Sequence, residues 1–184
     1  MTTKDPAPVA EHALVDDAKP TPWSMARERL EHPEKPRTSW LATVRPDGRP
    51  HVMPLITFWL DGALYFITSQ STRKGMNLTR EPRCVITTSS TTLPSIDIVV
   101  EGLAERVTDA SDLRRAVDMF VANEWPSLEI RGDSVYGPNA PSAGPPPYGM
   151  FRLVPSVAFG LPGMYGMEQF KPEELPKPTR WEFS

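Results

Sequence analysis

The sequence predicts a mainly β protein: a small antiparallel barrel of about six strands, closed or split, with two or three short helices. About six β-rich runs follow one another with only short helical segments between them. This order favours pairing of neighbouring strands over a doubly wound parallel sheet. Two of the turns carry an Asp-Gly pair between apolar runs, Asp47-Gly48 and Asp61-Gly62, and such a pair is a strong hairpin signal.

Length and charge limit the possible functions. The chain has 184 residues, enough for one sizeable core, so we expect one domain with extensions. Its net charge of -3 argues against nucleic-acid binding as the main task. Cys84 is the only cysteine, which excludes an intrachain disulfide and fits a reducing compartment. No apolar run has the length of a membrane span and the N-terminus lacks a signal peptide's apolar core, so a cytoplasmic protein with no membrane partner is expected.

The N-terminal part divides into an arm and a helix. Residues 1–20 are polar and contain prolines, so we expect a flexible arm, followed by the barrel domain over 21–184. The stretch "TPWSMARERLEH" predicts a short helix with Thr21 as its N-cap and Pro22 at its first position. Its apolar side chains recur at helical spacing, so the helix is expected to lie on a sheet or on a partner chain.

Residues 39–69 predict an antiparallel meander of three runs, joined by the two Asp-Gly turns. Pro50 and Pro54 lie in the second run and cannot donate ladder hydrogen bonds. One side of that strand is therefore expected to be free or bulged, and a ligand could pair with its backbone there.

The remaining elements are read from periodicity and from breakers. We expect a helix over 72–80, strands over 83–90 and 95–109, a helix over 111–124 capped by Ser111, and a final strand over 149–160. Residues 125–147 are rich in proline and glycine, and this loop is too long for a simple connector. It is expected to be either functional or disordered.

Common catalytic signatures are absent from the sequence. There is no GxGxxG after a strand, no GK[ST] loop and no GxSxG elbow. The three histidines are scattered, and one cysteine cannot build a cysteine-rich zinc site. Neither a side-chain nucleophile nor a bound metal is indicated.

The stretch "TSQSTRKGMNL" at 68–78 is the strongest candidate site. It places hydroxyls before the start of a helix, followed at once by Arg73 and Lys74. Cations at a helix start oppose the helix dipole. A bound dianion would make them favourable, and hydroxyls with free backbone N–H groups form a good phosphate site. The alternative is an exposed first turn whose charges face water.

Other candidates have plain structural readings beside the functional ones. His51 fits an ordinary strand residue, and Thr87 belongs to a hydroxyl-rich strand end that could instead point into a polar groove. Arg180 and Trp181 would be unremarkable in a frayed tail. In an ordered tail, an aromatic and a basic side chain could cover a flat ring.

Taken together, the order of elements resembles the pyridoxamine 5'-phosphate oxidase-like split β-barrel family, including its branch that uses flavins or deazaflavins. The motifs that carry the resemblance are "WLATVRPDGRPHVMPL", "DGALYFITSQSTRKGMNLTREPRCVI" and "TRWEF". It covers about residues 23–124 and 148–183. It implies a homodimer of six-stranded split barrels with two cofactor sites at the subunit interface.

The resemblance also implies the cofactor and its contacts. The cofactor phosphate would lie at the hydroxyls and cations of 68–74, the second strand would run along the ring, and the C-terminal tail would close over the site. The implied cofactor-binding residues are His51, Val52, Met53, Pro54, Thr68, Ser69, Ser71, Arg73, Lys74, Asn77, Thr87, Arg180 and Trp181.

The implied activity is hydride transfer between F420 or FMN and a small organic substrate, with the chemistry supplied by the cofactor. The chain lacks a match to the family's substrate-binding Arg/His elements, so the substrate is not expected to be vitamin B6. Arg73, Arg80 and Arg83 could meet the acidic tail of F420, whereas FMN needs only the phosphate cradle. Two alternatives remain: a non-catalytic flavin- or haem-binding protein for storage or sensing, and an oligomeric barrel without a cofactor.

Overall fold

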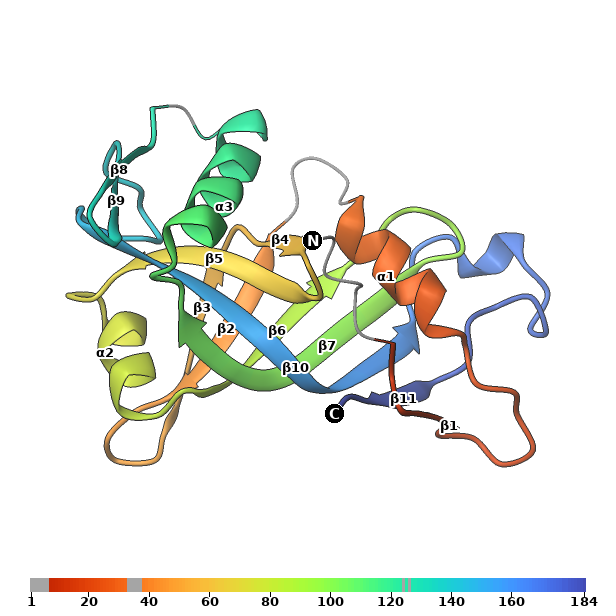
Figure 1. Ribbon diagram of the computed structural model, residues 1–184. Coiled ribbons are helices and arrows are strands. Elements are labelled where there is room, and N and C mark those ends of the chain that lie inside the picture. The colour runs from red at the N-terminus through yellow and green to blue at the C-terminus, as the bar shows by residue number, and fades with distance from the viewer. Residues whose placement is uncertain (1–6, 33–37, 124, 126) are drawn as a thin grey trace.

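The computed structural model describes residues 7–32, 38–123, 125 and 127–184. Short helices flank an extended sheet (Figure 1). The elements in chain order are β1 (Ala10–Ala13), α1 (Trp23–Glu31), β2 (Ser39–Val44), β3 (Pro50–Leu55), β4 (Phe58–Leu60), β5 (Ala63–Ser69), α2 (Arg73–Arg80), β6 (Arg83–Ser89), β7 (Ile96–Arg106), α3 (Ala110–Ala122), β8 (Glu129–Arg131), β9 (Ser134–Tyr136), β10 (Tyr148–Pro162), a 3-10 turn (Met167–Gln169) and β11 (Thr179–Glu182).

The strands form one sheet in which every pair is antiparallel. Its main path is β1-β11-β10-β7-β6-β2-β3, and β10 also pairs with β5 and β9, which carry β4 and β8. The mainly β class is therefore confirmed. The count of six strands is wrong, because the sheet has eleven strands and is not closed. The additional strands are only three or four residues long, too short for periodicity to reveal.

The predicted meander is only partly correct. Both Asp-Gly hairpins form, and Asp61 and Gly62 take φ of 49° and 82°, the left-handed pair that a tight hairpin turn requires. The second run, however, divides into β3, which pairs with β2, and β4, which pairs with β5. Between them Thr57 is buried and its hydroxyl bonds to that of Ser39 at 2.7 Å. This break separates two hairpins that lie in different parts of the sheet.

Contrary to the prediction from the sequence, residues 10–13 do not belong to a flexible arm. These form β1, which pairs with β11 near the other end of the chain. The Glu11 carboxylate accepts the backbone N–H of Trp23 at 3.1 Å and so caps α1. A pairing across about 170 residues has no local signal. Residues 1–6 lie outside the described residues.

Two helix caps differ from the prediction. Thr21 does not cap α1, because its hydroxyl donates to the carbonyl oxygen of Lys177 at 3.0 Å. At α3 the cap is Asp109, whose carboxylate accepts the N–H groups of Ser111 and Asp112 at 2.9 and 3.0 Å. In the described part of the chain, no helix is long and apolar enough to cross a membrane.

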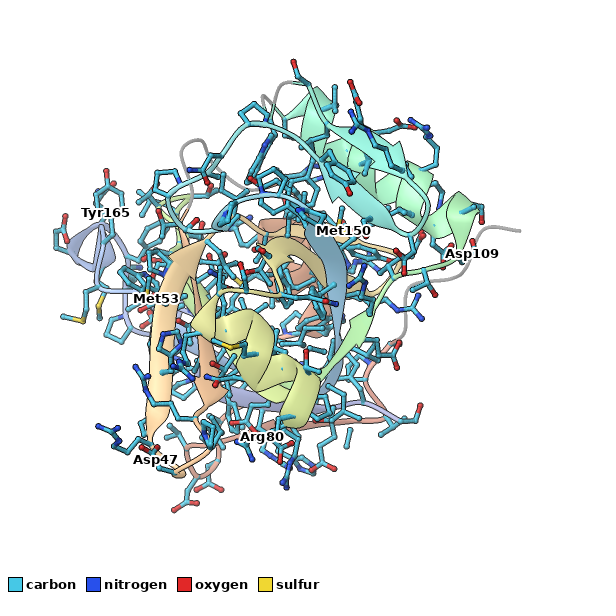
Figure 2. All side chains as sticks on the ribbon, turned by 90° about the vertical axis from the view of Figure 1, so that its left-hand side faces the viewer. Asp47, Met53, Arg80, Asp109, Met150 and Tyr165 are labelled. Atoms are coloured by element: carbon cyan, nitrogen blue, oxygen red, sulfur yellow. The ribbon has the colours of Figure 1, made fainter. Side chains whose placement is uncertain are left out.

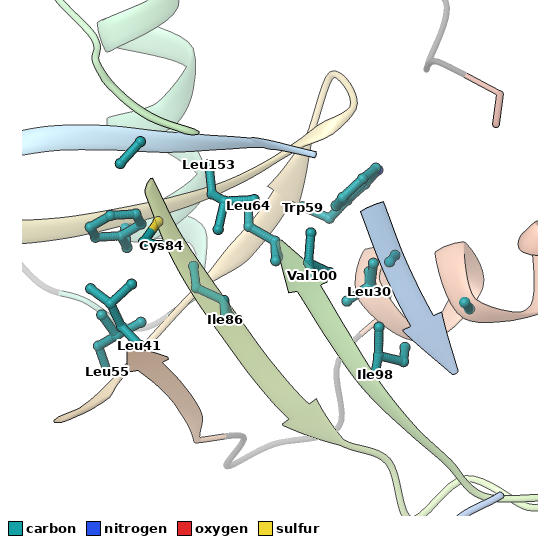
Figure 3. Packing of buried hydrophobic residues seen from close by; sticks show 14 of the residues in the cluster. Leu30, Leu41, Leu55, Trp59, Leu64, Cys84, Ile86, Ile98, Val100 and Leu153 are labelled. Atoms are coloured by element: carbon teal, nitrogen blue, oxygen red, sulfur yellow. The ribbon is translucent and has the colours of Figure 1, made fainter. Parts of the chain in front are cut away.

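Buried side chains form two clusters on opposite faces of the sheet. One lies inside the curved sheet under α1, with side chains such as Leu41, Ile86 and Val100 in contact (Figure 3). The other packs α3 and the β8–β9 hairpin against β5 and β10, and it includes Phe120 and Val135. The proline-rich 125–147 segment thus contains its own hairpin and contributes to the second cluster.

Candidate functional site

The start of α2 forms a compact hydroxyl turn. The Thr72 hydroxyl caps the helix by accepting the Gly75 N–H at 3.2 Å and donates to the Ser69 carbonyl oxygen at 2.7 Å. The Thr68 hydroxyl lies 2.9 Å from that of Thr72, and the Ser69 hydroxyl lies 2.9 Å from that of Ser71. A Cβ at Gly75 would collide with the Ser69 carbonyl oxygen, so the glycine allows the strand and helix to meet this closely.

Lys74 is the unusual residue of this turn. The residue is only 2 % exposed, and its ammonium group donates to the backbone carbonyl oxygen of Ser142. Among the described residues it forms no ion pair, and burial lowers the pKa of the amine. A buried cation is ordinarily paired with an acid, so this site lacks a negative charge.

Neighbouring basic groups share this feature. Arg73 is exposed and Arg45 is half-buried, and neither forms an ion pair with any residue described in the structure. The pKa of His51 is lowered by burial and by the charges of Arg45, Lys74 and Arg73. The predicted residues His51, Arg73 and Lys74 are therefore close enough to influence one another electrostatically.

Asn77 joins α2 to the β2–β3 hairpin. Its amide nitrogen donates to the Thr43 hydroxyl at 3.0 Å, and Thr43 is the cross-strand partner of His51. The Asn77 side-chain oxygen is buried without a hydrogen-bond partner in the structure. A buried acceptor without a donor costs free energy. Figure 2 looks onto α2 with β3 beside it, labelled at Met53, and the β2–β3 turn, labelled at Asp47.

The four predicted residues of β3 divide between the two faces of the sheet. His51 and Met53 are opposite Thr43 and Leu41, which point inward, and Val52 and Pro54 point to the other side. Thr87 lies on that outer side too, because it is opposite Trp40 and Trp40 is opposite Pro54. Within the described residues, β3 pairs only with β2, so its other edge is free.

The structure does not bring Arg180 and Trp181 to this turn within one chain. Along β10, Tyr148 is opposite Ser69 and Phe159 is opposite Arg180. Eleven extended residues separate these two positions by roughly 35 Å along the strand. Trp181 is fully buried, and its indole N–H donates to the Thr21 carbonyl oxygen at 3.1 Å. The structure therefore places Trp181 in the core, so it presents no face to a ring.

Sequence reasoning missed several residues of the site. Arg45 precedes an Asp-Gly turn and had an ordinary strand-end position, and Thr43 reads as one more inward strand residue. Ser142 lies in the proline-rich segment and contributes only its backbone carbonyl oxygen. A backbone contact made across 68 residues leaves no signal in side-chain patterns.

The arrangement fits a phosphate dianion. A lysine ammonium has three donors, and the Ser142 carbonyl oxygen is the only acceptor that Lys74 meets in the described structure. Lys74 belongs to the first turn of α2, and helix N-termini bind anions. Among the described residues, no group of His, Cys, Asp and Glu side chains could hold a metal.

Comparison with solved structures supports the same fold. A conserved hypothetical protein from Mycobacterium tuberculosis is 20% identical, with 85% of this chain and 92% of that chain covered and a TM-score of 0.57. A FAD-binding protein from Mesorhizobium loti is 18% identical, with coverages of 94% and 99% and a TM-score of 0.53. A haem-binding protein from Mycobacterium smegmatis is 18% identical, with coverages of 80% and 56% and a TM-score of 0.54. At these identities the likeness concerns the fold alone.

The family follows from the sequence match. No curated protein matches the chain. The family model described as pyridoxamine 5'-phosphate oxidase matches residues 25–155, which include β2 to β9 and the whole hydroxyl turn. The chain therefore belongs to the pyridoxamine 5'-phosphate oxidase-like family of FMN-binding split barrels.

Proposed function

We propose that this protein is an oxidoreductase that transfers hydride between F420 or FMN and a small organic substrate other than vitamin B6. The observation that carries the proposal is Lys74, a buried ammonium that meets no carboxylate in the described structure. Membership of an FMN-binding family gives the phosphate of a flavin-type cofactor as the natural anion for it.

The residues of the turn have distinct roles in this proposal. Ser69, Ser71, Arg73 and Lys74 hold the phosphate, while Thr68 and Asn77 keep the turn and the β2–β3 hairpin in register. The backbone of His51 to Pro54 lies along the ring, since β3 has a free edge in the described structure. The bound ring would supply the hydride chemistry, and the chain would bind it, orient it and exclude water.

The proposal includes a homodimer, and the outer face of the sheet supports it. Large apolar side chains are exposed there on β7, β2 and β3, with Leu103 48 %, Trp40 48 % and Val52 51 % exposed. Apolar groups gathered on one face mark an interaction surface. Thr87, Val52 and Pro54 belong to this face, so a second copy packed on it would meet the residues expected near the ring.

A dimer also offers a role to Arg180. Within one chain it lies at the far end of β10 from the hydroxyl turn. In a two-fold dimer whose axis exchanges the ends of the outer face, Arg180 of one chain approaches the turn of the other. An isologous interface of this kind is the commonest form of protein oligomer.

The choice between F420 and FMN rests on the free cations. Arg83 is engaged, because it makes a two-pronged contact with Glu81 at 2.9 and 2.7 Å and lowers the pKa of that carboxyl to about 2. Arg80 donates to the carbonyl oxygens of Val44 and Arg45 at 3.0 and 2.9 Å. With Arg73 at the phosphate, Arg45 remains for an additional anionic group, which F420 has and FMN lacks.

Side-by-side titration with FMN and F420, followed by fluorescence, tests the binding step. Stopped-flow oxidation of the bound reduced cofactor against a panel of acceptors then tests catalysis. Tight binding without any acceptor-dependent oxidation would favour the storage or sensing alternative. No optical change with either cofactor would refute the proposed function. A purely monomeric protein at micromolar concentration would refute the placement of the cofactor site at a subunit interface.

A further inference from the structure

Residues 138–144, which we call the strap, cross the start of α2. The backbone N–H of Ser69 donates to the Ala143 carbonyl oxygen at 2.8 Å, and the Lys74 ammonium group donates to the Ser142 carbonyl oxygen. Two successive carbonyl groups of the strap thus contact the strand end and the helix start that form the hydroxyl turn. The proline-rich segment, whose sequence resembles a loose loop, is a direct neighbour of the anion site.

The strap is tightly packed against that site. It closes on itself through a turn in which the N–H groups of Ala143 and Gly144 donate to the Ala140 carbonyl oxygen at 3.1 and 2.9 Å. Gly144 has φ of +79°, and a Cβ there would collide with the Thr72 side chain. The position of the strap therefore fixes the position of the Ser142 carbonyl oxygen.

Tyr148 holds both ends of the strap. Its hydroxyl lies 2.7 Å from the carbonyl oxygen of Pro138 and 3.0 Å from that of Gly144. A single O–H proton is shared between these two acceptors. Its backbone is opposite Ser69 in the β5–β10 ladder, and the residue is 1 % exposed. One side chain thus links the strand that carries the turn to both ends of the strap.

We propose that Tyr148 is a positioning residue for the anion site. It holds the strap so that the Ser142 carbonyl oxygen takes one of the three donors of the Lys74 ammonium group and directs the other two toward the anion. The inference rests on the proposed function in one respect only, which is that the anion is the phosphate of the cofactor.

The first test compares FMN with riboflavin, which is FMN without its phosphate. In Tyr148→Phe we expect FMN to bind about three- to tenfold more weakly, the range for a neutral hydrogen bond, with riboflavin binding unchanged. If the wild type takes F420 instead, its phosphate-free deazaflavin fragment replaces riboflavin. Tyr136→Phe is the matched control, because the Tyr136 hydroxyl has no hydrogen bond to any described residue.

A merely structural role for Tyr148 would weaken binding of both ligands equally, and that result would overturn the proposal. An unchanged affinity for FMN would also overturn it. The difference between the changes in FMN and riboflavin affinity is therefore the informative readout, because a general loss of folding would weaken binding of both ligands.

The second test uses the cofactor-free protein. Tyr148→Phe should accelerate hydrogen exchange at the Ser69 amide and reductive methylation of Lys74, each at least threefold, and Tyr136→Phe should change neither. If the wild type binds no cofactor but both rates rise, the proposed function fails and the positioning role stands. If neither rate changes, the positioning role is refuted whatever the cofactor.

Discussion

Replacement of Lys74 with methionine separates the effect of the buried cation on cofactor binding from its effect on folding stability. Methionine keeps much of the length of the side chain and removes the charge. A hydrogen bond to a charged group contributes about 1.5 to 3 kcal/mol, so we expect the cofactor to bind about 10- to 150-fold more weakly. Because Lys74 is only 2 % exposed, little of this effect is lost to screening by solvent.

The same substitution should not destabilise the cofactor-free protein. Burial lowers the pKa of Lys74 below its ordinary value of 10.5, so the charged form costs folding free energy. Between the lowered pKa and 10.5, the unfolded chain binds more protons than the folded one, and stability rises with pH. The gain in folding stability from Lys74→Met is thus complete below the lowered pKa and disappears as the pH approaches 10.5.

The assay combines isothermal titration with cofactor and urea unfolding of the cofactor-free protein from pH 7 to 10.5. Lys171→Met is the matched control, because Lys171 is exposed at the other end of the molecule, and it should change neither quantity. Unchanged cofactor affinity in Lys74→Met would remove this residue from the site. A large loss of stability in the cofactor-free variant would contradict the reading of Lys74 as an uncompensated charge.

Three further outcomes are expected. Trp40→Asp on the outer face should shift the protein to monomer in sedimentation velocity, whereas Val121→Asp, at an equally exposed position on α3, should not. The lowered pKa of His51 should rise in an NMR titration when phosphate or cofactor neutralises Arg73 and Lys74; without ligand, stability should fall as the pH drops from 6.5 through that lowered pKa. Cys84, with its pKa raised by burial to about 12, should resist thiol reagents at pH 8 in the folded protein and react once urea unfolds it.

Local chemistry made the hydroxyl turn predictable from the sequence. Thr72 and Gly75 stand at helix-start positions where a hydroxyl caps and a glycine permits close approach. The Asp-Gly turns likewise have a conformational cause that acts within four residues. The sequence therefore located α2 to within one residue and placed Lys74 beside the hydroxyls.

Contacts between distant segments were not predictable. β1 pairs with β11 across most of the chain, and Ser142 reaches Lys74 through a backbone oxygen. The prediction for Trp181 is wrong for a similar reason. An aromatic residue in a tail suggests contact with a cofactor ring. The tail instead forms β11, which buries Trp181 beside Trp23 with ring centroids 5.3 Å apart. A short strand is stabilised by the strand with which it pairs, and the residues of the short strand do not reveal which strand that is.

The buried charge explains why the turn and the strap belong together. An ammonium group without an acid is tolerated only where something fixes its place and supplies partial negative charge, and the Ser142 carbonyl oxygen does both. A carboxylate there would stabilise the cofactor-free protein more, but it would repel a phosphate. A neutral carbonyl oxygen leaves the positive charge uncancelled, so the free energy lost in burying Lys74 is recovered when an anion binds. A neutral carbonyl oxygen stabilises the buried ammonium group less than a carboxylate would, and for that reason it suits an anion-binding site.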